Sequence, residues 1–140
     1  MKQDQLNAWQ PAQFDRFVRI LEQDQLNHAY LFSGFFGSLE MAQFLAKSLF
    51  CTDKIGVLPC EKCRNCKLIE QEEFPDVTLI KPVNQVIKTE RIRELVGQFS
   101  QAGIESQQQV FIIEQAEKMH PNAANSLLKV IEEPQSEVYI

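Results

Sequence analysis

The sequence predicts an α/β protein whose parallel sheet carries helices on both faces. Short apolar runs of strand length alternate along the chain with longer segments whose apolar residues recur at helical spacing. Strands that alternate with helices are joined by right-handed crossovers, which make the strands parallel and place the helices on the sheet faces. The 140 residues are enough for one domain with a buried core. We therefore expect a single domain over residues 1–140, with a small inserted module at residues 51–66.

The first part of the chain predicts a helix, a strand and a second helix. Apolar side chains at helical spacing indicate an amphipathic helix at about residues 11–22. The run HAYLFSG, which ends at Gly34, has the composition of a buried strand that enters a turn. Ser38 is the expected N-cap of the next helix, which continues to Cys51.

The second part predicts three more strands and two more helices. The expected strands are DVTLI (76–80), VFII (110–113) and VYI (138–140). Thr89 is expected to cap a helix whose core-facing residues share one side: Ile92, Leu95, Val96 and Phe99. The last helix should end before Pro134 and carries three apolar residues expected in the core: Leu127, Leu128 and Ile131. Because the final strand is cut short at Ile140, we expect the chain to be part of a longer protein.

Composition and charge exclude several classes of protein. Apolar residues make up 44% and charged residues 24% of the chain, as in soluble globular domains. The net charge of -5 argues against a domain that grips nucleic acid by itself, because phosphate contacts need clustered lysines and arginines. No apolar run has the length of a membrane span, and the start of the chain, MKQDQLNAWQ, holds no signal-sequence core. We therefore expect a cytoplasmic protein with no membrane partner.

The strongest chemical signal is a group of four cysteines: Cys51, Cys60, Cys63 and Cys66. Their spacing, C-x8-C-x2-C-x2-C, places four thiolates in one short polar segment, where they can enclose a tetrahedral zinc ion. Four sulfur ligands leave no position for water, so we expect a structural, non-catalytic Zn2+. Free or redox-active cysteines and an iron–sulfur cluster are the alternatives. Neither His28 nor His120 has a partner at ligand spacing, so both are interpreted as ordinary polar residues.

The stretch FSGFFGSLEM stands where a phosphate-binding loop would stand, between an expected strand and an expected helix. Gly34 matches the first glycine of G-x-x-x-x-G-K-[ST], and Gly37 is a further glycine inside the turn. In the same alignment Leu39 replaces the last glycine, Glu40 the lysine and Met41 the hydroxyl residue. Leucine blocks the approach of phosphate to backbone amides, glutamate repels phosphate, and methionine offers no oxygen to magnesium. This loop is not expected to bind ATP.

A second informative position follows the expected strand VFII. A working ATPase holds Asp-Glu there for magnesium and water, whereas this chain has Glu114 followed by Gln115, which cannot act as a base. Two glycines after a strand are a weak signal and by themselves are equally compatible with a chance match. The two positions together favour a nucleotide site that has lost its chemistry.

Several motifs occur together: HAYLFSGFFGS, the cysteine group, FPDVTLIKP, IKTERIREL, VFIIEQAEKMHPNAANSLLKVIEEP and the final VYI. Together they closely resemble bacterial clamp-loader subunits of the AAA+ class, and they cover the chain from about His28 to Ile140. The ATPase subunits of that class keep the glycine, lysine and threonine that Leu39, Glu40 and Met41 replace here. The resemblance is therefore to the delta-prime (delta') subunits of DNA polymerase III, which look like ATPases without being ATPases.

This resemblance implies a P-loop/AAA+-type sheet with an inserted structural zinc module. It also implies a non-catalytic subunit that supports ATP-dependent loading of the sliding clamp onto primed DNA in chromosomal replication. The implied partners are the tau/gamma ATPase subunits and the delta subunit, with the sliding clamp and primer-template DNA contacted indirectly. The arginine finger that such subunits donate to a neighbour would follow the strand at VYI, beyond residue 140.

Two other functions stay open from the sequence. One is an active clamp-loader ATPase subunit with an unusual loop, which nucleotide binding would reveal. The other is a zinc-dependent nucleic-acid-binding module, against which the acidic pI near 5.1 weighs.

Overall fold

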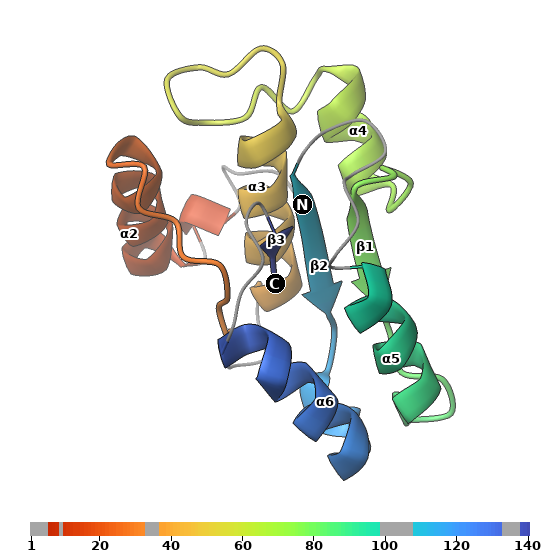
Figure 1. Cartoon of the computed structure of the whole chain (residues 1–140). Coiled ribbons are helices and arrows are strands. Elements are labelled where there is room, and N and C mark those ends of the chain that lie inside the picture. Colours follow the sequence, from red (N-terminus) through yellow and green to blue (C-terminus); the bar gives the residue numbers. More distant parts are fainter. Residues whose placement is uncertain (1–5, 9, 33–36, 99–107, 133–137) are drawn as a thin grey trace. The chain divides into compact units, whose positions relative to one another are not determined.

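The computed structural model describes residues 6–8, 10–32, 37–98, 108–132 and 138–140 (Figure 1). The chain forms two compact units. The first unit consists of Met1–Asn27 with Leu31–Phe74, and the second consists of His28–Tyr30 with Pro75–Ile140. Among the described helices, none combines the length and the apolar character that a membrane span needs.

The longer helices in the described part of the first unit are α2 (Pro11–Glu22), α3 (Ser38–Phe50) and α4 (Arg64–Glu70). Proline suits the first turn of α2, because its missing N–H would have no helical partner there. Phe14 of α2 packs on Phe44 of α3 with ring centroids 5.1 Å apart, and both side chains are buried. The bounds of α2 and α3 confirm the two helices that the apolar spacing predicted.

The start of α3 differs from the expected one. The N-cap is Gly37 rather than Ser38, and Ser38 is the first helical residue. Gly37 has a φ of 80°, in the left-handed region that glycine adopts without the steric cost of a side chain. The serine prediction is wrong because the turn requires this backbone conformation immediately before the helix.

Helix α4 (Arg64–Glu70) was not predicted from the sequence. It has seven residues, too few for an apolar repeat to stand out. Its N-cap is Cys63, whose sulfur accepts a hydrogen bond from the backbone N–H of Cys66 at 3.5 Å. Phe50 at the end of α3 packs against Phe74 beyond α4, with ring centroids 4.9 Å apart. The contact between Phe50 and Phe74 therefore brings together the two ends of the segment 51–73, which contains the four cysteines.

The second unit is built on a small parallel sheet in the order β1 (Val77–Ile80), β2 (Gln109–Ile113) and β3 (Val138–Tyr139). Val77 pairs with Val110, and Gln109 pairs with Val138. The parallel pairing confirms the crossover connections that the alternation of elements predicted. The sheet is smaller than expected, because no strand is assigned to the described part of the run HAYLFSG.

The first residues of that run nevertheless lie at the edge of the sheet. The N–H of Tyr30 donates to the carbonyl of Ile140 at 3.1 Å, and the N–H of Ile140 donates to the carbonyl of His28 at 2.8 Å. Alternating bonds of this kind join two parallel strands. Residues 28–30 therefore extend the sheet beyond β3, and Gly34 at the end of the run falls outside the described residues.

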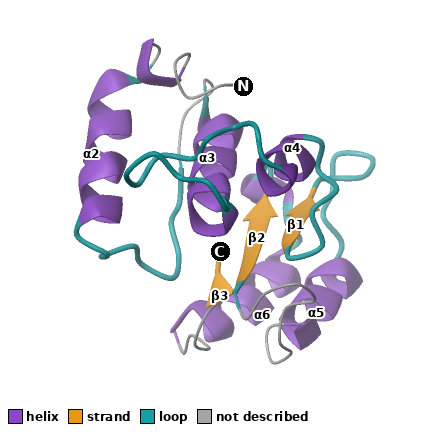
Figure 2. Ribbon diagram, turned by 90° about the horizontal axis from the view of Figure 1, so that it is seen from above, coloured by secondary structure: helices purple, strands orange, loops and turns teal. Residues whose placement is uncertain are grey.

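The core of the second unit lies between the strands and two helices, α5 (Thr89–Gln98) and α6 (Pro121–Glu132), which lie on one side of the sheet (Figure 2). Its buried residues come from β1, β2, both helices and the segment before α5: Ile80, Ile87, Ile92, Leu95, Phe111, Ala123 and Leu127. Ile80 and Phe111 share a face because the register pairs Thr78 with Phe111 and places Ile80 two residues further on. The helices cover that face.

The expected core residues are confirmed in part. Ile92 and Leu95 are fully buried, whereas Leu128 is 52% exposed, so its assignment to the core is wrong. Leu128 follows the buried Leu127 directly, and neighbouring residues on a helix point in directions about 100° apart. Phe99 and Pro134 fall outside the described residues.

Both histidines bind the ends of α6. The Nε2 atom of His28 donates to the carbonyl of Ile131 at 2.8 Å in the last turn. Nδ1 of His120 accepts a hydrogen bond from the N–H of Asn122 at 3.2 Å in the first turn. Helix ends leave backbone groups without helical partners, and these two side chains satisfy one group at each end.

Replacing Leu95 by alanine should lower the free energy of unfolding by about 2–5 kcal/mol, because it removes a fully buried side chain and leaves a cavity. The matched control is Val83→Ala, at a side chain 65% exposed, where the change should stay within about 0.5 kcal/mol. Urea denaturation followed by circular dichroism measures both. Equal losses in the two variants would contradict this core.

Replacing His28 by alanine should lower the free energy of unfolding by about 1 kcal/mol, because the carbonyl of Ile131 loses its side-chain donor. Gln25→Ala serves as the control, since Gln25 is exposed and its backbone bond to Ile20 is kept. The same urea titration measures the difference. A His28 variant as stable as the Gln25 variant would mean that the imidazole does not hold the end of α6.

Candidate metal centre

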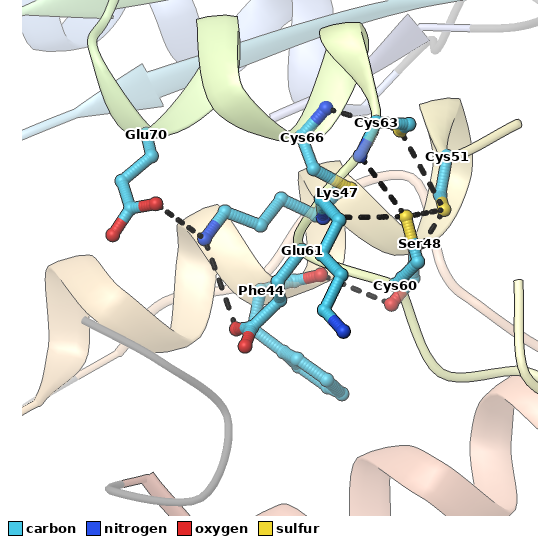
Figure 3. Close-up of polar contacts among 10 residues, drawn as sticks. Phe44, Lys47, Ser48, Cys51, Cys60, Glu61, Cys63, Cys66 and Glu70 are labelled. Carbon is cyan, nitrogen blue, oxygen red and sulfur yellow. Dashed lines mark hydrogen bonds and ion pairs between the residues drawn. The ribbon is translucent and has the colours of Figure 1, made fainter. Parts of the chain in front are cut away.

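The four cysteine side chains converge on one point in the first unit (Figure 3). Their Sγ atoms all lie within 4.8 Å of one another. The Sγ atoms of Cys51 and Cys60 are 3.5 Å apart, and those of Cys51 and Cys63 are 3.9 Å apart. All four cysteines are free of disulfides. The fold thus brings together every residue that the sequence spacing assigned to a metal.

Two elements present these side chains. Cys51 directly follows α3, and its backbone N–H donates to the carbonyl of Lys47 at 2.8 Å. Cys63 is the N-cap of α4, and Cys66 lies in the first turn of that helix. Cys60 belongs to the loop between the helices. One sulfur therefore comes from the end of α3, and three come from the segment that enters α4.

Backbone N–H groups point at the sulfur atoms. Sγ of Cys60 accepts hydrogen bonds from the N–H groups of Lys62 and Cys63, at 3.3 and 3.2 Å. Sγ of Cys51 accepts from the N–H groups of Asp53 and Cys60, at 3.4 and 3.2 Å. Such donors favour the thiolate over the thiol because they stabilise its negative charge. The loop therefore follows a path that suits thiolates.

The surroundings move the thiol pKa values in different directions. Burial raises the pKa of Cys66 and the pKa of Cys51. Burial also acts to raise the pKa of Cys63, but hydrogen bonds from Cys66 and Thr52 outweigh it and lower that pKa to about 6. The hydrogen bonds thus favour the thiolate of Cys63, whereas burial disfavours the thiolates of Cys51 and Cys66. A metal cation among the sulfurs favours the thiolate form.

The dimensions of the cluster fit a single tetrahedral ion. With bonds of about 2.3 Å, zinc sets its four sulfurs about 3.8 Å apart. The Cys51–Cys60 and Cys51–Cys63 sulfur separations, 3.5 and 3.9 Å, lie close to that value, and all four sulfurs lie within 4.8 Å of one another. An iron–sulfur cluster spreads its thiolates over several iron atoms, so its sulfur ligands stand farther apart than those of one ion. The four cysteines therefore form a site that can hold one metal ion.

The expected phosphate-loop residues lie at the start of α3. Gly34 falls outside the described residues, and Gly37 is the N-cap of the helix. Leu39 and Glu40 are half-buried in the first turn. Met41 is 3% exposed, and its N–H donates to the carbonyl of Gly37 at 2.9 Å. The side chain at the magnesium-binding position is thus part of the core.

Glu114 and Gln115 lie in the second unit, directly after β2. Glu114 is half-buried, and its N–H donates to the carbonyl of Ile80 at 2.9 Å. Gln115 is exposed, has a φ of 54° and is the N-cap of the 3-10 helix η1 (Ala116–Lys118). The two halves of the expected nucleotide site therefore belong to different units of the structure.

Sequence reasoning missed Lys47. This residue is 1% exposed and forms ion pairs with two glutamates of the cysteine segment and α4. The available signal was a lysine inside the apolar run FLAKSLF, four residues before the first cysteine of the group.

Comparisons with known proteins agree with the resemblance. The family model described as "DNA polymerase III, delta subunit" matches residues 9–140. The chain is 46% identical over 132 residues to DNA polymerase III subunit delta' of Bacillus subtilis, which covers 93% of this chain and 40% of that protein. It is 32% identical over 117 residues to subunit delta' of Pseudomonas aeruginosa, which covers 81% of this chain and 36% of that protein.

The chain is also similar to a tau/gamma protein. It is 35% identical over 116 residues to DNA polymerase III subunit tau/gamma of Haemophilus influenzae, which covers 81% of this chain and 17% of that protein. The chain thus spans less than half the length of each of these three relatives. Because the family match covers most of its length, the chain belongs to the DNA polymerase III delta-subunit family, as its motifs indicated.

Proposed function

We propose that this chain is a non-catalytic, delta'-type component of the bacterial DNA polymerase III clamp loader. In this role it supports the ATP-dependent loading of the sliding clamp onto primed DNA during chromosomal replication, in the cytoplasm. Its direct partners are the tau/gamma ATPase subunits and the delta subunit, and it contacts the clamp and primer-template DNA indirectly. Residues 1–140 form an AAA+-like domain in this proposal, with residues 51–66 as a zinc-binding insertion.

The observation that carries this proposal is the chemistry at the start of α3. A phosphate-binding helix needs a lysine and a hydroxyl at the positions of Glu40 and Met41. At about 4 Å, two unit charges interact by roughly 1 kcal/mol in water and roughly 4 kcal/mol at an effective dielectric of about 20. Replacing lysine by glutamate turns this attraction into repulsion. The buried Met41 thioether offers no oxygen to a magnesium ion.

The residues after β2 support the same conclusion. Gln115 stands where an ATPase keeps a carboxylate, and an amide does not act as a general base. The relative with 46% identity, in Bacillus subtilis, is a delta' subunit, whereas the delta' subunit of Pseudomonas aeruginosa (32%) and the tau/gamma subunit of Haemophilus influenzae (35%) are about equally similar to this chain. The altered positions therefore carry the preference for a delta'-type role over an ATPase role.

The metal of the cysteine cluster is a structural zinc ion in this proposal. Four sulfur ligands close the coordination sphere, so the ion has no open position for water or substrate. Zinc supplies a charge that lets the buried thiols lose their protons, and it links the end of α3 to the segment that enters α4. The cluster thereby orders a polar segment that buries few apolar side chains.

Saturable ATP binding should be absent in this protein at millimolar nucleotide with magnesium, measured with fluorescent ATP. The triple variant Leu39→Gly, Glu40→Lys, Met41→Thr should bind ATP more tightly, because it restores the amide approach, the cation and the hydroxyl. The single variant Leu39→Gly is the control, since it opens the loop without changing its charge. Micromolar binding by the unmodified protein would overturn the proposal and indicate an ATPase or nucleotide sensor.

The purified protein should contain one zinc ion per chain, and Cys60→Ser should reduce that content strongly. Lys62→Ala is the matched control, because it lies between two of the cysteines, is exposed and keeps the backbone N–H that donates to Cys60. Elemental analysis by plasma mass spectrometry measures the metal. Visible absorption with iron and acid-labile sulfide would contradict the zinc assignment, and equal zinc content in both variants would contradict the ligand set.

A further inference from the structure

A buried lysine lies next to the candidate metal centre. The side chain of Lys47 is 2% exposed, although lysine is almost never fully buried without a partner. Lys47 lies on α3 one turn before Cys51, and its carbonyl accepts the N–H of Cys51 at 2.8 Å. Its backbone therefore already holds the first cysteine of the cluster.

The ammonium group of Lys47 reaches the segment that carries the other three cysteines (Figure 3). Nζ lies 3.9 Å from Oε1 of Glu61 and 3.8 Å from Oε2 of Glu70. Glu61 stands between Cys60 and Cys63, and Glu70 is the last residue of α4. The side chain of Lys47 thus connects α3 to the loop before α4, through Glu61, and to the last residue of α4, Glu70.

Glu61 is the more buried of the two partners. Its side chain is 13% exposed, against 38% for Glu70. Its φ of 62° lies in the left-handed region, which costs free energy for a residue with a side chain and persists only where surrounding contacts impose it. The pair with Lys47 is one such contact. It holds the turn in which the backbone of Lys62 and Cys63 donates to the sulfur of Cys60.

Charge gives Lys47 a second effect. A divalent ion with four thiolates carries a net charge of about -2, and a carboxylate in the same loop adds to it. Electrostatic repulsion between these groups is strong where little water is present. The cation of Lys47 lies 3.9 Å from the carboxylate of Glu61 and so reduces the negative charge that this side chain presents to the metal centre.

We propose that Lys47 is a positioning residue for the metal centre, which joins the two elements that present the cysteines and reduces the negative charge that Glu61 presents to the centre. This inference rests on the proposed zinc site. Lys47 does not touch the metal and acts only through the segment it holds.

The test is zinc affinity, measured in the purified protein by competition with a chromophoric chelator. Lys47→Met should weaken zinc binding at least about tenfold, as for other residues that support metal ligands. Lys54→Met is the matched control: it is an exposed lysine three residues after Cys51 and should bind zinc like the unmodified protein. Lys47→Arg, which keeps the cation, should retain most of the affinity.

The double variant Lys47→Met, Glu61→Gln separates the charge effect from packing. It removes the carboxylate whose ion pair with the cation is lost in Lys47→Met, so its zinc affinity should lie closer to that of the unmodified protein than to that of Lys47→Met. This double variant also serves if Lys47→Met alone does not fold. A folded double variant that binds zinc as weakly as Lys47→Met, or more than about tenfold below the unmodified protein, would overturn the charge argument.

Two results distinguish this inference from the zinc site itself. If Lys47→Met loses stability in urea but binds zinc like Lys54→Met, Lys47 is a packing residue and the inference is wrong. If the unmodified protein and Lys54→Met both lack zinc and take up none, the metal centre itself is wrong.

Discussion

The first unit depends on holding four sulfur atoms within 4.8 Å of one another. The segment between α3 and α4 buries few apolar side chains, so the hydrophobic effect contributes little to its order. Two other kinds of interaction stabilise its conformation. Backbone N–H groups donate hydrogen bonds to sulfur, and the buried Lys47 forms ion pairs with the segment. The hydrogen bonds favour negative sulfur, and the ion pairs join the segment to α3. The arrangement of the segment therefore suits thiolates.

The second unit depends on a different interaction, the burial of apolar side chains between a parallel sheet and two helices. Ile80 and Phe111 from neighbouring strands and Ile92 and Leu95 from α5 form one continuous core. Two separate segments of the chain form this unit, His28–Tyr30 and Pro75–Ile140. Residues 28–30 join it through hydrogen bonds to Ile140 at the edge of the sheet. Non-local pairing of this kind ties distant parts of the sequence together, and His28 adds a bond to the last turn of α6.

The family relationship and the chemistry of α3 can be understood together. The residues that align with the phosphate-binding positions of an ATPase contribute to the helix itself. Glu40 lies in the first turn, where the helix dipole favours a negative charge, and Met41 adds a buried side chain to the core. In the proposed non-catalytic role these positions need not bind nucleotide, so they are free to serve the packing of the helix.

Local patterns of the sequence were sufficient for much of this structure. Apolar spacing located α2, α3 and α5, the runs DVTLI and VFII located β1 and β2, and cysteine spacing grouped the four thiols. Each of these signals can be read from residues that lie close together in the sequence. The short helix α4, the left-handed cap at Gly37 and the exposure of Leu128 were not predictable, because each depends on contacts or backbone angles that no period encodes.

By itself the sequence determined the α/β class and the family, and it is the source of the proposal that the nucleotide site is altered. Only the tertiary structure decided that Lys47 is buried beside the cysteines and paired with Glu61 and Glu70, and that His28 and His120 bind opposite ends of α6. The physical reason is that a charged or polar side chain prefers water and is buried only where it finds partners. Its position depends on which partners the folded chain brings within reach.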